Sequence, residues 1–205
     1  SSDLLAKALP WVGHPPTRSR GTVGGSISHA DPSAEIPLVA VTLGADIEIA
    51  NTSGNTTMPA DEFIIGPMLT AVMPGDCVRA VRFPVWSHAR VGTGFHEVSA
   101  RQSDFAFVAA AAQVALDEDG RCTEAVLGLG GVGDRAIRID VAALVGYEPS
   151  AAAASDIVRA ALADIEIGSD LHVSESYRRR VAVTLAIRAL DDAIAEARLA
   201  DKVLQ

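Results

Sequence analysis

Residues 18–37 read RSRGTVGGSISHADPSAEIP, and this glycine-rich stretch is the most informative part of the sequence. Its two adjacent glycines let the backbone approach a ligand closely and turn amide groups toward an anion. Thr22 and Ser26 add hydroxyl donors, and Glu35 can accept hydrogen bonds from sugar or ribityl hydroxyls. On residue chemistry alone, a phosphate-binding loop and an ordinary surface loop before a capped helix both remain open.

The segments around this stretch predict a mixed first half. Glycine and proline are so dense over residues 11–33 that we expect a loop there. Residues 34–43 are apolar enough for a short buried helix. Alternating apolar residues predict strands at 45–50 and 77–85, with a return strand at 56–58 after a turn.

The second half predicts an antiparallel sheet followed by helices. Three strands joined by short turns are expected at residues 94–100, 104–116 and 122–129, and two helices at about 150–164 and 174–199. Strands and helices are mixed without strict βαβ alternation, so the predicted class is α+β. The polar segment 87–93 is the preferred boundary, and it divides the chain into residues 1–87 and 88–205.

Composition excludes several classes of function. The chain has 205 residues, with 17 Lys and Arg against 26 Asp and Glu and a net charge of −9. This balance argues against nucleic-acid binding and against a polybasic membrane-surface protein. No apolar run reaches the roughly 18 residues of a spanning helix. Two cysteines cannot hold an iron–sulfur cluster alone, and they indicate reduced thiols in a cytosolic protein.

A second glycine run, GLGGVG at residues 128–133, matches the dinucleotide pattern G-x-G-x-x-G. That pattern requires a strand before it and a helix after it. Here it precedes residues 134–140, which alternate like an extended segment and favour a tight turn in an antiparallel sheet. A nicotinamide-dependent dehydrogenase using this loop is therefore an alternative hypothesis, and it would require a parallel sheet.

Landmarks along the whole chain closely resemble one family. They are VGH at 12–14, the 18–37 stretch, PADEF at 59–63, PGD at 74–76, FHEV at 95–98, SDFA at 103–106, LGGVG at 129–133 and SESYRR at 174–179. The chain resembles the FAD-binding medium subunit of molybdenum hydroxylases, of the carbon monoxide dehydrogenase type; xanthine dehydrogenase carries the same module. The resemblance implies the C-terminal part of an FAD-binding domain, followed by a three-stranded antiparallel sheet with helices.

The resemblance also implies which residues contact FAD. The positions it assigns are Val12, Thr22, Val23, Gly24, Gly25, Ser26, Glu35, Val78 and His96. The T-x-G-G-S segment wraps the phosphate region in that family. Val78 stands where an aliphatic residue packs on the flavin, and Phe105 stands near the expected position of the ring. His96 falls where a basic residue is frequent, which puts that contact in doubt because a neutral imidazole cannot replace a permanent ammonium.

The family carries an earlier subdomain with a second glycine motif of A-G-G-x-S-L type, which this sequence does not contain. We therefore expect these residues to hold about half of the family's FAD site. The resemblance implies an oxidoreductase subunit that passes electrons from iron–sulfur clusters to an external acceptor. Its expected partners are a large subunit with a molybdenum cofactor and a small iron–sulfur subunit, in a cytoplasmic dimer of heterotrimers.

The residues give no reason to expect other catalytic chemistry in this chain. No catalytic acid, base or nucleophile is predicted, because in flavoproteins the redox chemistry belongs to the cofactor. The histidines show no metal-ligand spacing, so no metal site is predicted. A cofactor-free assembly or scaffold module remains a further alternative.

Overall fold

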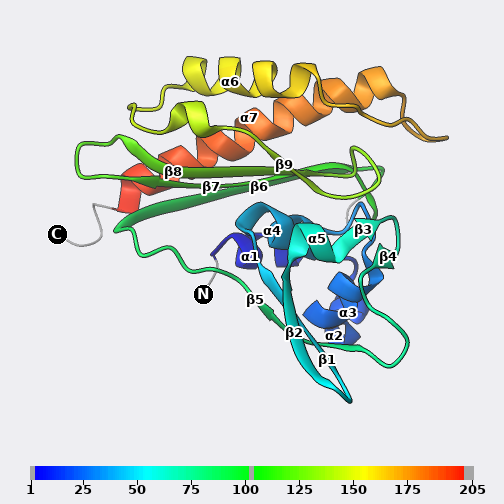
Figure 1. Cartoon of the computed structure of the whole chain (residues 1–205). Coiled ribbons are helices and arrows are strands. Elements are labelled where there is room, and N and C mark those ends of the chain that lie inside the picture. The colour runs from blue at the N-terminus through cyan, green and yellow to red at the C-terminus, as the bar shows by residue number, and fades with distance from the viewer. Residues whose placement is uncertain (1–2, 102–103, 201–205) are drawn as a thin grey trace.

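The computed structural model describes residues 3–101 and 104–200. Its centre is an antiparallel sheet with the strand order β6-β7-β8-β9 (Figure 1). The strands are β6 (Arg90–Ser99), β7 (Ala106–Leu116), β8 (Cys122–Gly130) and β9 (Ile137–Ile139). The predicted three-stranded meander is confirmed, and the extended segment after the second glycine run adds a short fourth strand.

Two helices cover one face of this sheet (Figure 1). They are α6 (Ala151–Ala163) and α7 (Glu175–Leu199), and both begin where the sequence predicts. Ser150 and Ser174 cap them by accepting hydrogen bonds from the backbone N–H groups of Ala153 and Tyr177. Helix α7 lies close to β6 because β6 carries glycine where a side chain would collide: a Cβ at Gly94 would lie 2.0 Å from a backbone carbonyl oxygen of α7.

The other face of the sheet is covered by α1 (Asp3–Ala8) and α4 (Glu35–Leu43). Every residue of α4 is buried, as its apolar composition predicts. The close approach of α4 to β8 also depends on a glycine, because a Cβ at Gly128 would lie 1.9 Å from Oγ1 of Thr42. Since helices pack on both faces, the inner strands are apolar on both sides, which explains the long apolar run in β7.

A smaller sheet lies on the far side of α4 from α7 (Figure 1). Its order is β2-β1-β5, and it is formed by β1 (Asp46–Asn51), β2 (Gly54–Pro59) and β5 (Cys77–Arg82). The remaining short elements are η1 (Leu9–Trp11), α5 (Ala60–Phe63), β3 (Ile64–Gly66), β4 (Leu69–Thr70) and η2 (Ala142–Leu144).

The predicted loop at residues 11–33 is wrong, because it contains two short helices, α2 (Pro15–Arg20) and α3 (Val23–His29). Proline is tolerated in the first turn of α2, where the backbone N–H has no intrahelical partner. Thr22 caps α3, and Ala30 ends it in a left-handed conformation. Density of glycine and proline therefore marked helix ends here rather than the absence of helix.

The polar segment 87–93 is also partly strand, since β6 begins at Arg90. The division at 87/88 stays a prediction, while α4 from the first half packs directly on the sheet of the second half. Ser103 of the SDFA landmark lies outside the described residues. Among the helices that the structure describes, none combines the length and the apolar character needed to cross a bilayer.

Candidate functional site

A large cavity, with a volume of about 910 Å³, lies beside α2, α3 and the start of α4. This volume is within the range of roughly 300–1,000 Å³ typical of small-molecule sites. The lining comes from three separate segments: residues 9–26, residues 29–36, and Asp104 with Phe105 just before β7. The large cavity thus combines residues from both predicted halves of the chain.

The T-x-G-G-S segment forms the beginning of α3. Oγ1 of Thr22 accepts a hydrogen bond from the backbone N–H of Gly25 at 2.9 Å, and both residues line the large cavity. A Cβ on Gly25 would itself lie 2.9 Å from that Oγ1, so a side chain there would disturb the cap. The predicted phosphate-binding loop is therefore the capped start of a helix. Because Gly25 has no side chain, the Thr22 cap can form directly at the cavity wall.

The large cavity has basic side chains on one side and acidic side chains on another. Arg18 and Arg20 come from α2, and a guanidinium nitrogen of Arg18 donates to the carbonyl oxygens of Val12, at 3.1 Å, and of Gly13. The carboxyl groups of Asp31 and Glu35 lie toward α4. Arginine is suited to phosphate groups, and carboxylates are suited to hydroxyl donors.

Two carboxyl groups in the cavity wall have shifted pKa values. Burial raises the pKa of Glu35, which is 8% exposed, and the neighbouring charge of Asp31 adds to that rise. The pKa of Asp104 is lowered, first by a hydrogen bond from the backbone N–H of Phe105 and further by Arg101. Phe105 itself is 70% exposed and presents an apolar ring to the cavity.

A small cavity of about 270 Å³ shares Val23 with the large one. Its other lining residues are Gly24, Val78, Arg79, Ala80, Val81 and Phe83. Six of the nine positions predicted to contact FAD line the large cavity: Val12, Thr22, Val23, Gly25, Ser26 and Glu35. Gly24 and Val78 line the small one. These eight positions are thus gathered around two cavities that share a residue.

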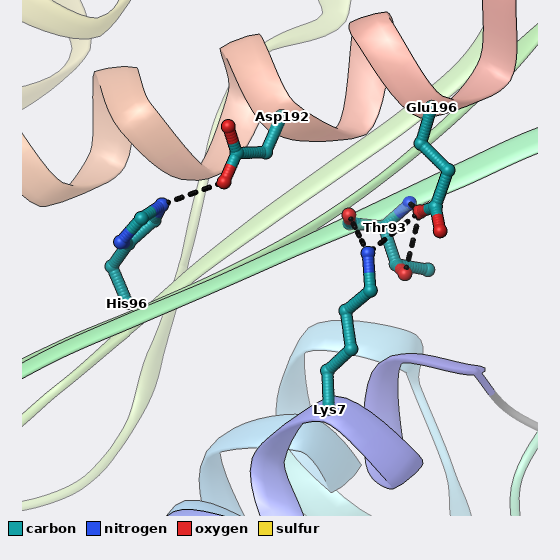
Figure 2. Close-up of polar contacts among 5 residues, drawn as sticks. All are labelled: Lys7, Thr93, His96, Asp192 and Glu196. Atoms are coloured by element: carbon teal, nitrogen blue, oxygen red, sulfur yellow. Dashed lines mark hydrogen bonds and ion pairs between the residues drawn. The ribbon is translucent and has the colours of Figure 1, made fainter. Parts of the chain in front are cut away.

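His96 has different surroundings. Its Nε2 lies 2.8 Å from Oδ2 of Asp192 on α7, on the face of β6 that α7 covers (Figure 2). It is not a lining residue of either cavity. Of the nine positions that the resemblance assigns to FAD, His96 is therefore the one that lies at neither cavity.

Comparisons with known proteins show which family the chain belongs to. The sequence model of the FAD binding domain in molybdopterin dehydrogenase matches residues 1–86, and that of the CO dehydrogenase flavoprotein C-terminal domain matches residues 93–193. The carbon monoxide dehydrogenase medium chain of Afipia carboxidovorans is 30% identical over 206 residues, which cover 96% of this chain and 71% of that one. The chain belongs to the FAD-binding medium-subunit family of molybdenum hydroxylases.

Two further members of this family are similar over nearly the whole chain. The 6-hydroxypseudooxynicotine dehydrogenase complex subunit alpha of Paenarthrobacter nicotinovorans is 35% identical over 199 residues, which cover 95% of this chain and 66% of that subunit. The crystal structure of quinoline 2-oxidoreductase from Pseudomonas putida 86 matches with a TM-score of 0.88 at 33% identity, covering 96% of this chain and 68% of that one. The chain thus spans about two thirds of the length of these two relatives.

The residues of the large cavity fit the FAD of this family. A dinucleotide has an anionic diphosphate, several hydroxyl groups and a flat apolar ring. The cavity offers arginine on α2, the carboxyl of Glu35, and exposed apolar surface on Phe105. Gly25 leaves the backbone of α3 without a side chain beside the capping hydroxyl, so a ligand can approach it closely.

The structure contradicts the requirement of the nicotinamide hypothesis. The run at residues 128–133 ends β8, turns at Gly131 with a φ of +71°, and leads to β9, which pairs antiparallel with β8. The element after this loop is a strand rather than a helix, and the sheet around it is antiparallel.

Within the described residues, no group of three or more His, Cys, Asp or Glu side chains is arranged to hold a metal ion.

Sequence reasoning missed several residues of the site. Arg18, His14 and Asp31 line the large cavity, although no contact was predicted for them. The sequence offered one indication of their importance, which is that all three lie within the family landmarks. Glu97 lies in the FHEV landmark, but no role was predicted for it: it is 8% exposed, and neither of its carboxylate oxygens has a hydrogen-bond partner among the described residues.

Proposed function

We propose that this chain holds FAD in an oxidoreductase of the molybdenum hydroxylase family and passes electrons from iron–sulfur clusters to an external acceptor. The observation that carries the proposal is the large cavity, which brings six predicted FAD positions together with two arginines and Phe105. The family membership of the chain supports the same cofactor.

The chain's own residues bind and orient the cofactor. The Thr22–Ser26 segment and Arg18 receive the diphosphate, and the Glu35 carboxylate accepts hydrogen bonds from hydroxyl groups. Val12 and Phe105 provide apolar surface for the ring, with Val78 behind the α3 segment. When bound, FAD supplies the electron-transfer chemistry, and the protein supplies its position and its electrostatic surroundings.

The proposed assembly includes two partners. A large subunit with a molybdenum cofactor acts on the substrate, and a small subunit with iron–sulfur clusters relays the electrons. We further propose a dimer of heterotrimers in the cytoplasm, with residues 1–87 as an FAD-binding unit and 88–205 as a C-terminal α+β unit. The names of the relatives support the subunit arrangement, since they are called complex subunit alpha and medium chain.

The test uses the natural chain that carries these residues, purified together with the proteins that accompany it. Its flavin and iron–sulfur absorbance is recorded, and the flavin is then removed and titrated back. The decisive variant is Gly25→Ala, because its Cβ would lie 2.9 Å from the capping oxygen of Thr22. We expect this variant to bind FAD at least about tenfold more weakly, which corresponds to about 1.4 kcal/mol.

Gly133→Ala is the matched control. This glycine is exposed, and a Cβ there would meet nothing within 4 Å. We expect the control to bind FAD like the wild type, which also tests the glycine run of the nicotinamide hypothesis. Absence of flavin and of FAD binding in the folded wild type would refute the proposal and favour a cofactor-free scaffold.

A further inference from the structure

Glu97 is a buried acid near the C-terminal end of β6. Its strand neighbour Phe95 belongs to the apolar core formed with α1 and α4, and alternation along the strand places Glu97 on the same face. The residue is 8% exposed, and both carboxylate oxygens lack a hydrogen-bond partner in the part of the chain that the structure describes. A buried polar group without a partner is costly, so its presence calls for a ligand, a proton or a second group.

The charged group that acts on Glu97 is Glu35. Burial raises the pKa of Glu97 to about 8, and the charge of Glu35 contributes to the rise. Glu35 is the first residue of α4 and lines the large cavity, where Asp31 acts on it in turn. The three buried acids thus form a series, in which Asp31 acts on Glu35 at the cavity wall and Glu35 acts on Glu97 in β6.

The charged side chains of α1 and α7 that contact β6 bind partners other than Glu97. From α1, Lys7 Nζ donates to the carbonyl oxygen of Thr93 at 2.7 Å and lies 2.8 Å from Glu196 Oε2 (Figure 2). From α7, Glu196 accepts hydrogen bonds from Thr93, and Asp192 contacts His96 on the opposite face of the strand. On β7, the residue directly opposite Glu97 is Ala109, which carries no charge.

We propose that Glu35 and Glu97 are a carboxyl pair with one negative charge between them, in which Glu97 keeps the proton so that Glu35 presents its charge to the hydroxyl groups of the bound cofactor. Glu97 is then a positioning residue that acts through Glu35. The inference rests on the proposed FAD site and assigns the protonation state of the two acids beside it. Two carboxylates that interact in a poorly hydrated interior do not both ionise readily.

The negative charge is assigned to Glu35 because the two acids stand in different secondary structure. Glu35 stands in the first turn of a helix, where the N-terminal end of the helix dipole stabilises a negative charge, and a backbone hydrogen bond lowers its pKa. Glu97 stands in a strand, which has no comparable dipole, and its carboxylate has no donor beside it among the residues that the structure describes. The proton therefore belongs on Glu97.

The consequence is that FAD binding takes up a proton when the pH is high enough to ionise Glu97 in the free protein. With Glu97 protonated in the bound form, FAD affinity is constant well below pH 8 and falls above it. A group with a pKa of about 8 makes the affinity about tenfold weaker at pH 9 than at pH 7.

The experiment measures FAD affinity between pH 6 and pH 9 on the natural complex after removal of its flavin. Three forms are compared: wild type, Glu97→Gln, and Glu62→Gln as a control at an exposed glutamate. We expect the wild type and the control to lose about tenfold in affinity from pH 7 to pH 9, whereas Glu97→Gln stays flat. Ionisation of the flavin itself is common to all three forms and cancels in the comparison.

A second measurement counts the protons directly. Calorimetric titration in buffers of different ionisation enthalpy at pH 9 is expected to show uptake of nearly one proton by the wild type and none by Glu97→Gln. This readout needs only the wild type if the variant fails to fold. Failure of every form to bind FAD would refute the proposed function, whereas binding without proton uptake, or with the same pH profile in Glu97→Gln, would overturn the carboxyl pair alone.

Discussion

Replacing Glu97 with glutamine is expected to stabilise the cofactor-free chain increasingly as the pH rises. The pKa of Glu97 is about 8 in the folded protein, against an ordinary value of 4.5. Between pH 4.5 and pH 8, Glu97 is therefore protonated in the folded protein and ionised in the unfolded chain. The stability that the Glu97 proton contributes to the wild type is fully present below pH 4.5 and is lost progressively up to pH 8, whereas glutamine does not titrate.

The size of this effect follows from the two pKa values. Each pH unit between them costs the wild type about 1.4 kcal/mol relative to the variant. Between pH 5 and pH 7, the difference in the free energy of unfolding should therefore grow by about 3 kcal/mol. For a chain of this length, that corresponds to a relative rise of about 10 °C in the melting temperature of the variant.

The assay is urea unfolding followed by tryptophan fluorescence at pH 5, 6, 7 and 8. Trp11 reports on the region of interest, because its ring lies 6.2 Å from that of Phe95 on β6. A buried glutamine carries a pH-independent cost of its own, so the slope against pH is the quantity compared. Glu62→Gln, an exposed substitution, is the control. Equal slopes for Glu97→Gln and the wild type would show that Glu97 does not hold its proton.

Three other substitutions test the large cavity and the packing of the sheet. Thr22→Ala removes the cap of α3 and should cost about 1 kcal/mol of stability, with weaker FAD binding in a titration. Gly94→Ala would place its Cβ 2.0 Å from a backbone oxygen of α7 and should lower the melting temperature by more than about 10 °C, measured by circular dichroism. His96→Gln should leave FAD affinity within about twofold, since His96 contacts α7; a loss of tenfold or more would restore the flavin contact that the resemblance implies.

The parts of the fold that could be predicted depend on local signals. Ser150 and Ser174 stand directly before apolar helical patterns, and each caps a helix in the structure. The turn at residues 117–120 separates two apolar runs that pair as antiparallel strands. These elements were predictable because capping and turn formation depend on a few adjacent residues.

The helices α2 and α3 were not predictable in the same way. Both are shorter than two full turns and contain proline or adjacent glycines, which disfavour helix in isolation. Their stability comes from packing: Ile27 of α3 is fully buried, and the backbone N–H of Met68 donates to the carbonyl oxygen of Ala30 just after it. Such contacts join residues that are distant in the sequence, so the local pattern does not contain them.

Glu97 escaped the sequence analysis for a related reason. Alternation of apolar and polar residues separates an inner from an outer face only when one face of the strand meets solvent. Helices cover both faces of β6, so a charged residue in this strand does not mark an outward position. Seven of the eight cavity positions lie in family landmarks, and Val78 follows one of them closely. Glu97 also lies in a landmark, FHEV, but its burial became visible only in the three-dimensional packing.

The organisation of the large cavity argues that the two matched sequence regions work as one unit. The two sequence models cover residues 1–86 and 93–193 separately. Yet Asp104 and Phe105, from the second region, line a cavity built mainly from the first, and Glu97 on β6 interacts electrostatically with Glu35. Helix α4 makes this possible, because it is buried against the sheet along its length while its first residue faces the cavity. A displacement of α4 relative to the sheet would therefore change both the cavity wall and the environment of its buried acids.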